Sequence, residues 1–126
     1  MPVPSQVLLY IDDPARSAAF YADLLPQSAS LSSPDKTLFS LSPGMKLGLC
    51  SRSKVEPAAP ATGSAVELCF TVPDIAALRA LHAQWILKGI FIAQGPKGTG
   101  FGASAFVGMD PDGHRLRVIT SDLVLG

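Results

Sequence analysis

The chain carries one plan twice, and this repeat constrains its fold more than any other feature. QVLLYIDDPARSAAFYADLL starts at Gln6, and ELCFTVPDIAALRALHAQWI starts 61 residues later, at Glu67. Each stretch reads as a short apolar strand, an aspartate and a helix. Asp13 and Asp74 suit helix N-caps, because a carboxylate accepts hydrogen bonds from the free amides of the first turn. The repeat therefore predicts two similar modules in one chain.

The remaining periodicity extends each module to βαβββ. Gly89 is expected to end the second helix. A Pro-, Ala- and Ser-rich segment, residues 53–64, reads as a linker between a module of about 5–52 and one of about 65–122. The predicted fold class is α+β, with residues 1–126 as one domain in which two curved mixed sheets enclose a cavity. We expect helices over 14–25 and 75–88, and strands near 29 and over 37–42, 46–52, 90–94, 104–109 and 114–120.

Composition excludes several classes of partner. Lys+Arg 10 balances Asp+Glu 10, which argues against a nucleic acid or an anionic membrane as partner. The first residues, MPVPSQVLLYIDD, lack the basic start and long apolar run of a signal peptide or membrane span. Cys50 and Cys69 do not form CxxC and read as reduced thiols of a cytoplasmic protein. With 48% hydrophobic residues, the chain predicts extra buried surface, such as a dimer interface or an apolar pocket.

Three motifs in this order carry a family resemblance: DDPARSAAFYADLL, VPDIAALRAL and DPDGHRLRV. Together they resemble the vicinal oxygen chelate superfamily, the glyoxalase/bleomycin resistance/dioxygenase fold. KLGLCSRSKVEP, ALHAQWILKG, the FG at 101–102 and FVGMDPDGHRLRV further resemble its phenazine-resistance, drug-binding branch. That resemblance implies a swapped homodimer that binds flat aromatic antibiotics. The chain departs from the branch at Cys50, where a tryptophan is common, and at FGASAF, where FGRTF is common.

The resemblance also implies four metal-ligand positions, which fall on Gln6, Gly48, Glu67 and Arg117. Gln6 and Glu67 could bind a divalent metal through oxygen, whereas Gly48 has no side chain. Arg117 brings a permanent positive charge where a glutamate is usual. We therefore expect no metal and no other cofactor. Arg117 is expected either to pair with Glu67 across the cavity or to hold a ligand carboxylate.

The alternation of side chains along strands predicts which residues line the cavity. Residues of one parity share a face, so Leu8 and Tyr10 should face the same space as Gln6. GPKGTGFG, residues 95–102, reads as a mobile glycine-rich loop at the cavity mouth rather than a phosphate loop, because a helix does not follow it. The predicted ligand-binding residues are Gln6, Leu8, Tyr10, Phe39, Gly48, Cys50, Glu67, Cys69, Phe101 and Arg117.

The function expected from these features is a metal-free homodimer that sequesters a planar aromatic compound, such as a phenazine- or bleomycin-type antibiotic. No residue is assigned to catalysis. The alternative is a metal-dependent glyoxalase-type lyase or isomerase, or an extradiol-type dioxygenase, that uses Gln6 and Glu67. Nothing in the sequence places His82 or His114 beside a cysteine, so both histidines read as structural. Trp85, on the apolar stripe of the second helix, reads as a core residue.

Overall fold

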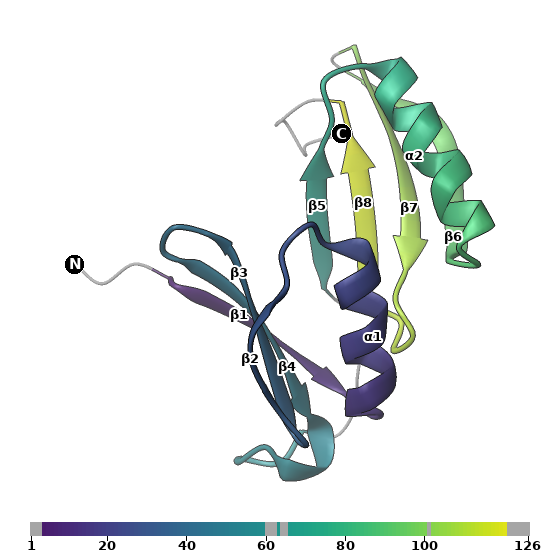
Figure 1. The fold of residues 1–126 in the computed structure, drawn as a ribbon. Coiled ribbons are helices and arrows are strands. Elements are labelled where there is room, and N and C mark those ends of the chain that lie inside the picture. Colours follow the sequence, from purple (N-terminus) through teal and green to yellow (C-terminus); the bar gives the residue numbers. More distant parts are fainter. Residues whose placement is uncertain (1–3, 60–62, 64–65, 101, 121–126) are drawn as a thin grey trace. The chain divides into compact units, whose positions relative to one another are not determined.

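The computed structural model describes residues 4–59, 63, 66–100 and 102–120. The chain divides into two compact units, Met1–Gly63 and Ser64–Gly126, here called module one and module two. In Figure 1 the colours of module one run from purple to teal, and those of module two run from teal to yellow. The predicted α+β fold of two βαβββ modules, each with a four-stranded mixed sheet, is confirmed.

Module one contains a helix and four strands in the strand order β1-β4-β3-β2. β1 runs parallel to β4, and the other neighbours are antiparallel. α1 contacts β4 and β3, so one face of the sheet is covered by the helix. The elements are β1 (Gln6–Ile11), α1 (Pro14–Leu24), β2 (Ala29–Ser33), β3 (Lys36–Ser42), β4 (Met45–Ser51) and the 3-10 helix η1 (Arg52–Lys54).

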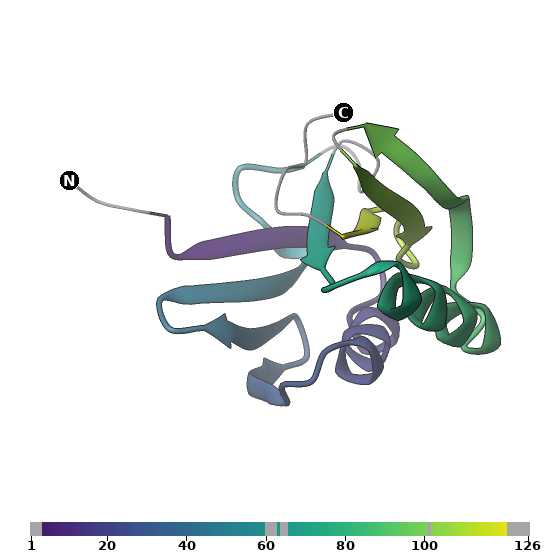
Figure 2. The ribbon, with the colours of Figure 1, turned by 90° about the horizontal axis from the view of Figure 1, so that it is seen from above.

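Module two repeats this topology with the order β5-β8-β7-β6, and β5 runs parallel to β8. Its helix, α2, packs on β6 and β7, as the view in Figure 2 also shows. The expected glycine-rich loop at 95–100 is wrong, because these residues continue a long, irregular edge strand. The elements are β5 (Glu67–Thr71), α2 (Ile75–Leu87), β6 (Phe91–Gly100), β7 (Ala103–Met109) and β8 (Arg115–Ile119).

Both helices begin as the repeat predicts. Oδ1 of Asp13 accepts from the backbone N–H of Arg16 at 3.1 Å, and Oδ1 of Asp74 accepts from that of Ala77 at 2.8 Å. Each cap satisfies an amide that has no partner inside its helix. α2 ends before Gly89, whose φ of +78° is a left-handed conformation that glycine adopts without steric cost.

The core of module one lies between its sheet and α1. Leu9, Leu47 and Phe39 are nearly inaccessible to solvent, and Tyr21 of α1 is fully buried with them. Burying each large apolar side chain stabilises the fold by about 1.5–3 kcal/mol. Phe39 is in register with Leu47, which places it on this helix-covered face. The prediction that Phe39 lines a ligand cavity is therefore wrong.

Trp85 of α2 is the centre of the module two core, as its position on the apolar stripe predicts. It is 2% exposed and packs edge-on against Phe70 and Phe106, while His82 also contacts Phe106. A Cβ at Gly108 would lie 2.8 Å from the indole ring. Glycine is needed there because the sheet approaches the tryptophan too closely for a side chain.

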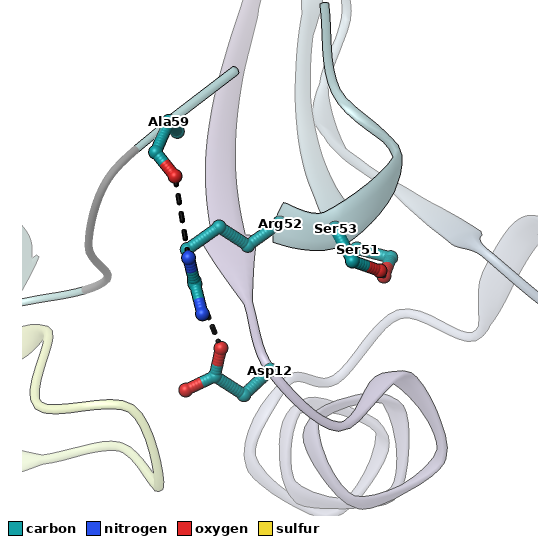
Figure 3. A network of polar contacts seen from close by, with 5 residues as sticks. All are labelled: Asp12, Ser51, Arg52, Ser53 and Ala59. Carbon is teal, nitrogen blue, oxygen red and sulfur yellow. Dashed lines mark hydrogen bonds and ion pairs between the residues drawn. The ribbon is translucent and has the colours of Figure 1, made fainter.

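The start of the predicted linker is held against module one rather than extended freely (Figure 3). Arg52 Nε donates to Asp12 Oδ1 at 3.0 Å, and its Nη1 donates to the carbonyl oxygen of Ala59 at 3.3 Å. The hydroxyls of Ser51 and Ser53 are hydrogen bonded at 3.1 Å. Arg52, the first residue of η1, thus ties Ala59 to Asp12, which directly follows β1. In the part of the chain that the structure describes, neither helix has the length and apolar character to cross a bilayer.

Candidate functional site

The sheet face of module one opposite α1 carries most of the predicted ligand-binding residues of this half. Register pairs Leu8 with Gly48 and Tyr10 with Cys50, so the four share a face, as predicted. Leu8 is 47% exposed and Tyr10 36% exposed. Gln6 lies on the same face, opposite Lys46. This face offers an apolar and aromatic surface that α1 does not cover.

Leu38 takes the position on this face that the sequence analysis assigned to Phe39. It pairs with Gly48, and a Cβ on Gly48 would lie 3.0 Å from Leu38 Cδ2 and 2.6 Å from Leu8 Cδ2. The side chains of Leu8 and Leu38 therefore occupy the space that a side chain on residue 48 would need. Successive side chains of a strand point to opposite faces, so an expected register that differs by one residue from the observed one exchanges Phe39 for Leu38 on this face.

A cavity of about 290 Å³ opens at one end of this face. It brings together three predicted residues, Leu8, Tyr10 and Cys50. One side of the cavity is formed by Lys54, Val55 and Glu56, which could not be predicted because the sequence of this segment is typical of a linker. Its volume lies at the lower end of the range for small-molecule sites. The full lining is Leu8, Tyr10, Asp35, Lys36, Cys50, Ser51, Lys54, Val55 and Glu56.

In module two, Glu67 and Arg117 form a two-pronged ion pair. Arg117 Nε donates to Glu67 Oε1 at 3.0 Å, and Arg117 Nη2 donates to Glu67 Oε2 at 3.0 Å. Arg115 Nη1 lies 3.8 Å from Glu67 Oε2 and adds a weaker contact. The predicted pairing is confirmed, but the residues are diagonal neighbours on adjacent strands, since register sets Glu67 beside Arg115 and Arg117 beside Cys69.

This geometry shifts the ionisation of both partners. The hydrogen bonds from Arg117, with its positive charge, hold the pKa of Glu67 below its usual range, although partial burial opposes the shift. The same hydrogen bonds raise the pKa of Arg117. Both groups are thus charged at neutral pH, and the carboxylate oxygens of Glu67 are already engaged.

Cys69 lies beside Arg117 on the same face, but its environment disfavours the thiolate. Desolvation raises the pKa of the thiol, and the charge of Glu67 adds to this effect. A nucleophilic cysteine needs the opposite shift. His82 packs on Phe106 on the helix side of the sheet, whereas Cys69 alternates with Phe70, which packs on that side. The sheet therefore separates Cys69 from His82.

The DPDGH turn contains a buried Asp–His pair that the sequence analysis missed. Asp110 Oδ2 and His114 Nδ1 are 2.7 Å apart, and the two side chains are 0% and 3% exposed. Asp110 Oδ1 also accepts from the backbone N–H groups of Asp112 and His114, at 2.9 and 2.8 Å. The spacing Asp-x-x-x-His across a Pro-Asp-Gly turn was the sequence feature that could have predicted this pair. Asp110 closes the turn that leads into β8 and so helps to place Arg117.

The sequence profile described as Glyoxalase/Bleomycin resistance protein/Dioxygenase superfamily matches residues 4–118. The chain belongs to this superfamily. The solution NMR structure of protein ATC0852 from Agrobacterium tumefaciens is 43% identical, with a TM-score of 0.86 over 95% of this chain and 98% of that one. No curated protein matches the chain.

More distant members share the fold. A glyoxalase-related enzyme from Fulvimarina pelagi is 18% identical, with a TM-score of 0.83 over 96% of this chain and 89% of that one. A lactoylglutathione lyase from Agrobacterium tumefaciens is 19% identical, with a TM-score of 0.75 over 97% of this chain and 96% of that one. At this level of identity the likeness extends to architecture alone.

The superfamily's metal positions can be tested against the residues that stand there. Gly48 offers no donor, and Arg117 offers a cation whose hydrogen bonds engage both oxygens of Glu67. Among the residues that the structure describes, no three His, Cys, Asp or Glu side chains are grouped so as to hold a metal. This donor set does not fit a divalent cation, which prefers several oxygen or nitrogen ligands without a neighbouring positive charge.

Phe101, the remaining predicted ligand-binding residue, lies outside the described residues.

Proposed function

We propose that the protein binds a small planar aromatic compound without a metal ion and protects the cell by sequestering it. The observation that carries this proposal is the two-pronged ion pair between Arg117 and Glu67. It puts a fixed cation where a metal-binding member of the superfamily would carry a carboxylate. Sequestration needs affinity and no chemistry, which agrees with the raised pKa of the Cys69 thiol.

The cavity of module one supports the aromatic character of the ligand. Tyr10 and Leu8 supply an aromatic ring and an apolar side chain, both partly exposed, and the buried Cys50 lines the same cavity. Aromatic rings stack offset or edge-to-face, and such contacts stabilise a complex beyond simple burial of area. A flat ring system is the guest that this surface fits best.

The resemblance to the phenazine-resistance branch makes a phenazine the first compound to test. The homodimer expected from the same resemblance is part of the proposal. Ile86, Leu87 and Phe91 support it, because they expose 53%, 88% and 67% of their surface at the end of α2 and the start of β6. Exposed apolar groups of this size often lie in contacts between protein chains.

The first experiment measures metal content after incubation of the protein with Ni, Zn, Mn and Fe(II) and desalting. We expect less than about a tenth of an equivalent per chain, because the donor set does not fit a divalent cation. Near-stoichiometric metal that disappears in Glu67→Gln would contradict the proposal and would favour a metal-dependent lyase or dioxygenase.

The second experiment measures binding of phenazine by titration calorimetry and by the rise in melting temperature. Tyr10→Ala should weaken binding at least tenfold, whereas Val7→Ala, which shortens an equally exposed side chain on the other face of the same strand, should leave it unchanged. Equal affinity of both variants, or no binding of any planar aromatic compound, would refute the proposal. Trp85 emission is a poor reporter because the indole is buried on the helix side of its sheet.

A further inference from the structure

Module two contains a second hollow, which we call the β6–β8 cleft. It has a volume of about 350 Å³ and is lined by Gln94, Lys97, Gly98, Thr99 and Arg117. An adjoining cavity of about 210 Å³ shares Gln94 and Arg117 and adds Ala93, Val107 and Arg115. Register explains the hollow, because the short side chain of Val107 separates Gln94 from Arg117 and Ala105 lies opposite Lys97.

The charges around the β6–β8 cleft do not balance. Lys97, Arg115 and Arg117 are cationic, and Glu67, bound to the last two, is the carboxylate that the described residues place beside them. Three positive charges against one negative charge leave two positive charges in excess. The chain as a whole carries no net charge, so this excess is local. A local cationic surface attracts an anion rather than a metal ion.

Arg117 retains hydrogen-bonding capacity after it pairs with Glu67. A guanidinium has five N–H donors, and Glu67 uses the edge formed by Nε and Nη2. The other edge, formed by Nη1 and Nη2, can bind a second oxyanion through two parallel hydrogen bonds. In the described part of the chain, no acceptor is bonded to that edge. Glu67 also holds the guanidinium in place, which reduces the entropy lost when a second anion binds.

Thr99 points independently to a ligand in the same cleft. Its hydroxyl oxygen is buried and, among the described residues, has no hydrogen-bond partner. Buried polar groups are nearly always hydrogen bonded, so an unsatisfied hydroxyl in a cleft indicates a missing partner. Lys97 and Gln94, also in the lining, supply further N–H donors.

We propose that the β6–β8 cleft binds an oxyanion, a carboxylate or a phosphate group, through Arg117, Lys97 and the hydroxyl of Thr99. This site belongs to module two alone. It goes beyond the aromatic binding proposed for the cavity of module one and does not rest on it. The charge excess, the open edge of the guanidinium and the unsatisfied hydroxyl converge on the same chemical class of ligand.

The test is an NMR titration of the ¹⁵N-labelled protein with benzoate, benzamide and inorganic phosphate. The Arg117 Nε–H and Thr99 amide signals report on the site, and chemical-shift changes give the affinity. Benzoate or phosphate should move both signals, whereas neutral benzamide, which matches benzoate in shape, should not. The stronger of the two anions identifies the group that the cleft prefers.

Variants separate a specific site from general anion binding. Lys97→Gln removes a charge and Thr99→Val removes a hydroxyl at nearly constant volume, and each should weaken anion binding at least fivefold. Lys88→Gln, which changes an exposed lysine at the end of α2 outside the cleft, is the matched control and should have no effect. Equal shifts with benzamide, or anion binding that Lys97→Gln leaves unchanged, would overturn the proposal. Failure of phenazine binding in the calorimetric experiment would leave this result intact.

Discussion

The ion pair between Glu67 and Arg117 is expected to stabilise module two by about 1 kcal/mol, measured as a coupling energy. Two unit charges roughly 4 Å apart attract by about 1 kcal/mol in water and by about 4 kcal/mol at an effective dielectric constant of 20. The side chains of Arg117 and Glu67 are 22% and 32% exposed, so solvent and the loss of side-chain freedom reduce the larger value. The two parallel hydrogen bonds place the pair near the upper end for exposed ion pairs.

A double-mutant cycle measures this quantity. Glu67→Gln, Arg117→Met and the double variant are unfolded with urea at neutral pH, and the coupling energy is the part of their effects that does not add. Arg115→Met is the matched control, because Arg115 lies 3.8 Å from Glu67 and its side chain is 51% exposed. Its coupling to Glu67 should stay below about 0.3 kcal/mol.

The coupling should also depend on pH with a definite sign. The folded-state pKa of Glu67 lies below the usual value of 4.5, so the stabilisation is fully present above that value. It is lost as the pH falls through the lower, folded-state pKa, where the carboxylate of Glu67 becomes protonated. A coupling below about 0.3 kcal/mol at neutral pH, or one that persists in strong acid, would refute the account of this pair.

Four substitutions test the packing and ionisation described above. Gly108→Ala should lower the free energy of unfolding by about 1–3 kcal/mol, because the new methyl group would meet the buried indole of Trp85. Gly48→Ala should lower it by less than about 1 kcal/mol, because the new methyl group meets only leucine methyl groups that can move. Equal losses for the two variants in urea unfolding would contradict this account of the packing. Glu67→Gln should lower the pKa of the Cys69 thiol, which the pH dependence of its alkylation by iodoacetamide measures, and an unchanged profile would exclude the electrostatic contribution. Asp110→Ala should lower the free energy of unfolding by about 2–4 kcal/mol, because it leaves a buried imidazole and two backbone amides without their acceptor, and a smaller loss would show that water replaces the carboxylate.

Features that depend on local chemistry could be predicted from the sequence. Asp13 and Asp74 cap their helices through contacts three residues away, and Gly89 ends α2 by its own conformation. Because the two halves of the sequence repeat each other, the same strand order could be expected for both sheets. The pairing of Arg117 with Glu67 followed from the family resemblance, which places both residues at metal-ligand positions, and the two lie diagonally across the parallel strands β5 and β8.

Features that depend on register or on weak local preference could not be predicted. Phe39 and Leu38 are both apolar, so only the pairing with β4 decides which one faces α1. Residues 95–100 contain three glycines and a proline, which indicate a loop, yet pairing with β7 keeps them in a strand. The cleft that this strand helps to form could not be recognised while the segment was read as a loop.

The filled space at Gly48 has a consequence for the order in which mutations could restore a metal-binding chain. A glutamate at position 48 would have to displace the Leu8 and Leu38 methyl groups that now occupy the space of its Cβ, so it is accepted most easily after one leucine has become smaller. At position 117 a glutamate would stand beside Glu67, and the two carboxylates would repel each other until a cation is bound. Introducing a glutamate at position 48 or at position 117 is thus unfavourable until the accompanying change, a smaller leucine neighbour or a bound cation, is present. Selection acting one substitution at a time would therefore tend to hold the chain in its present chemistry.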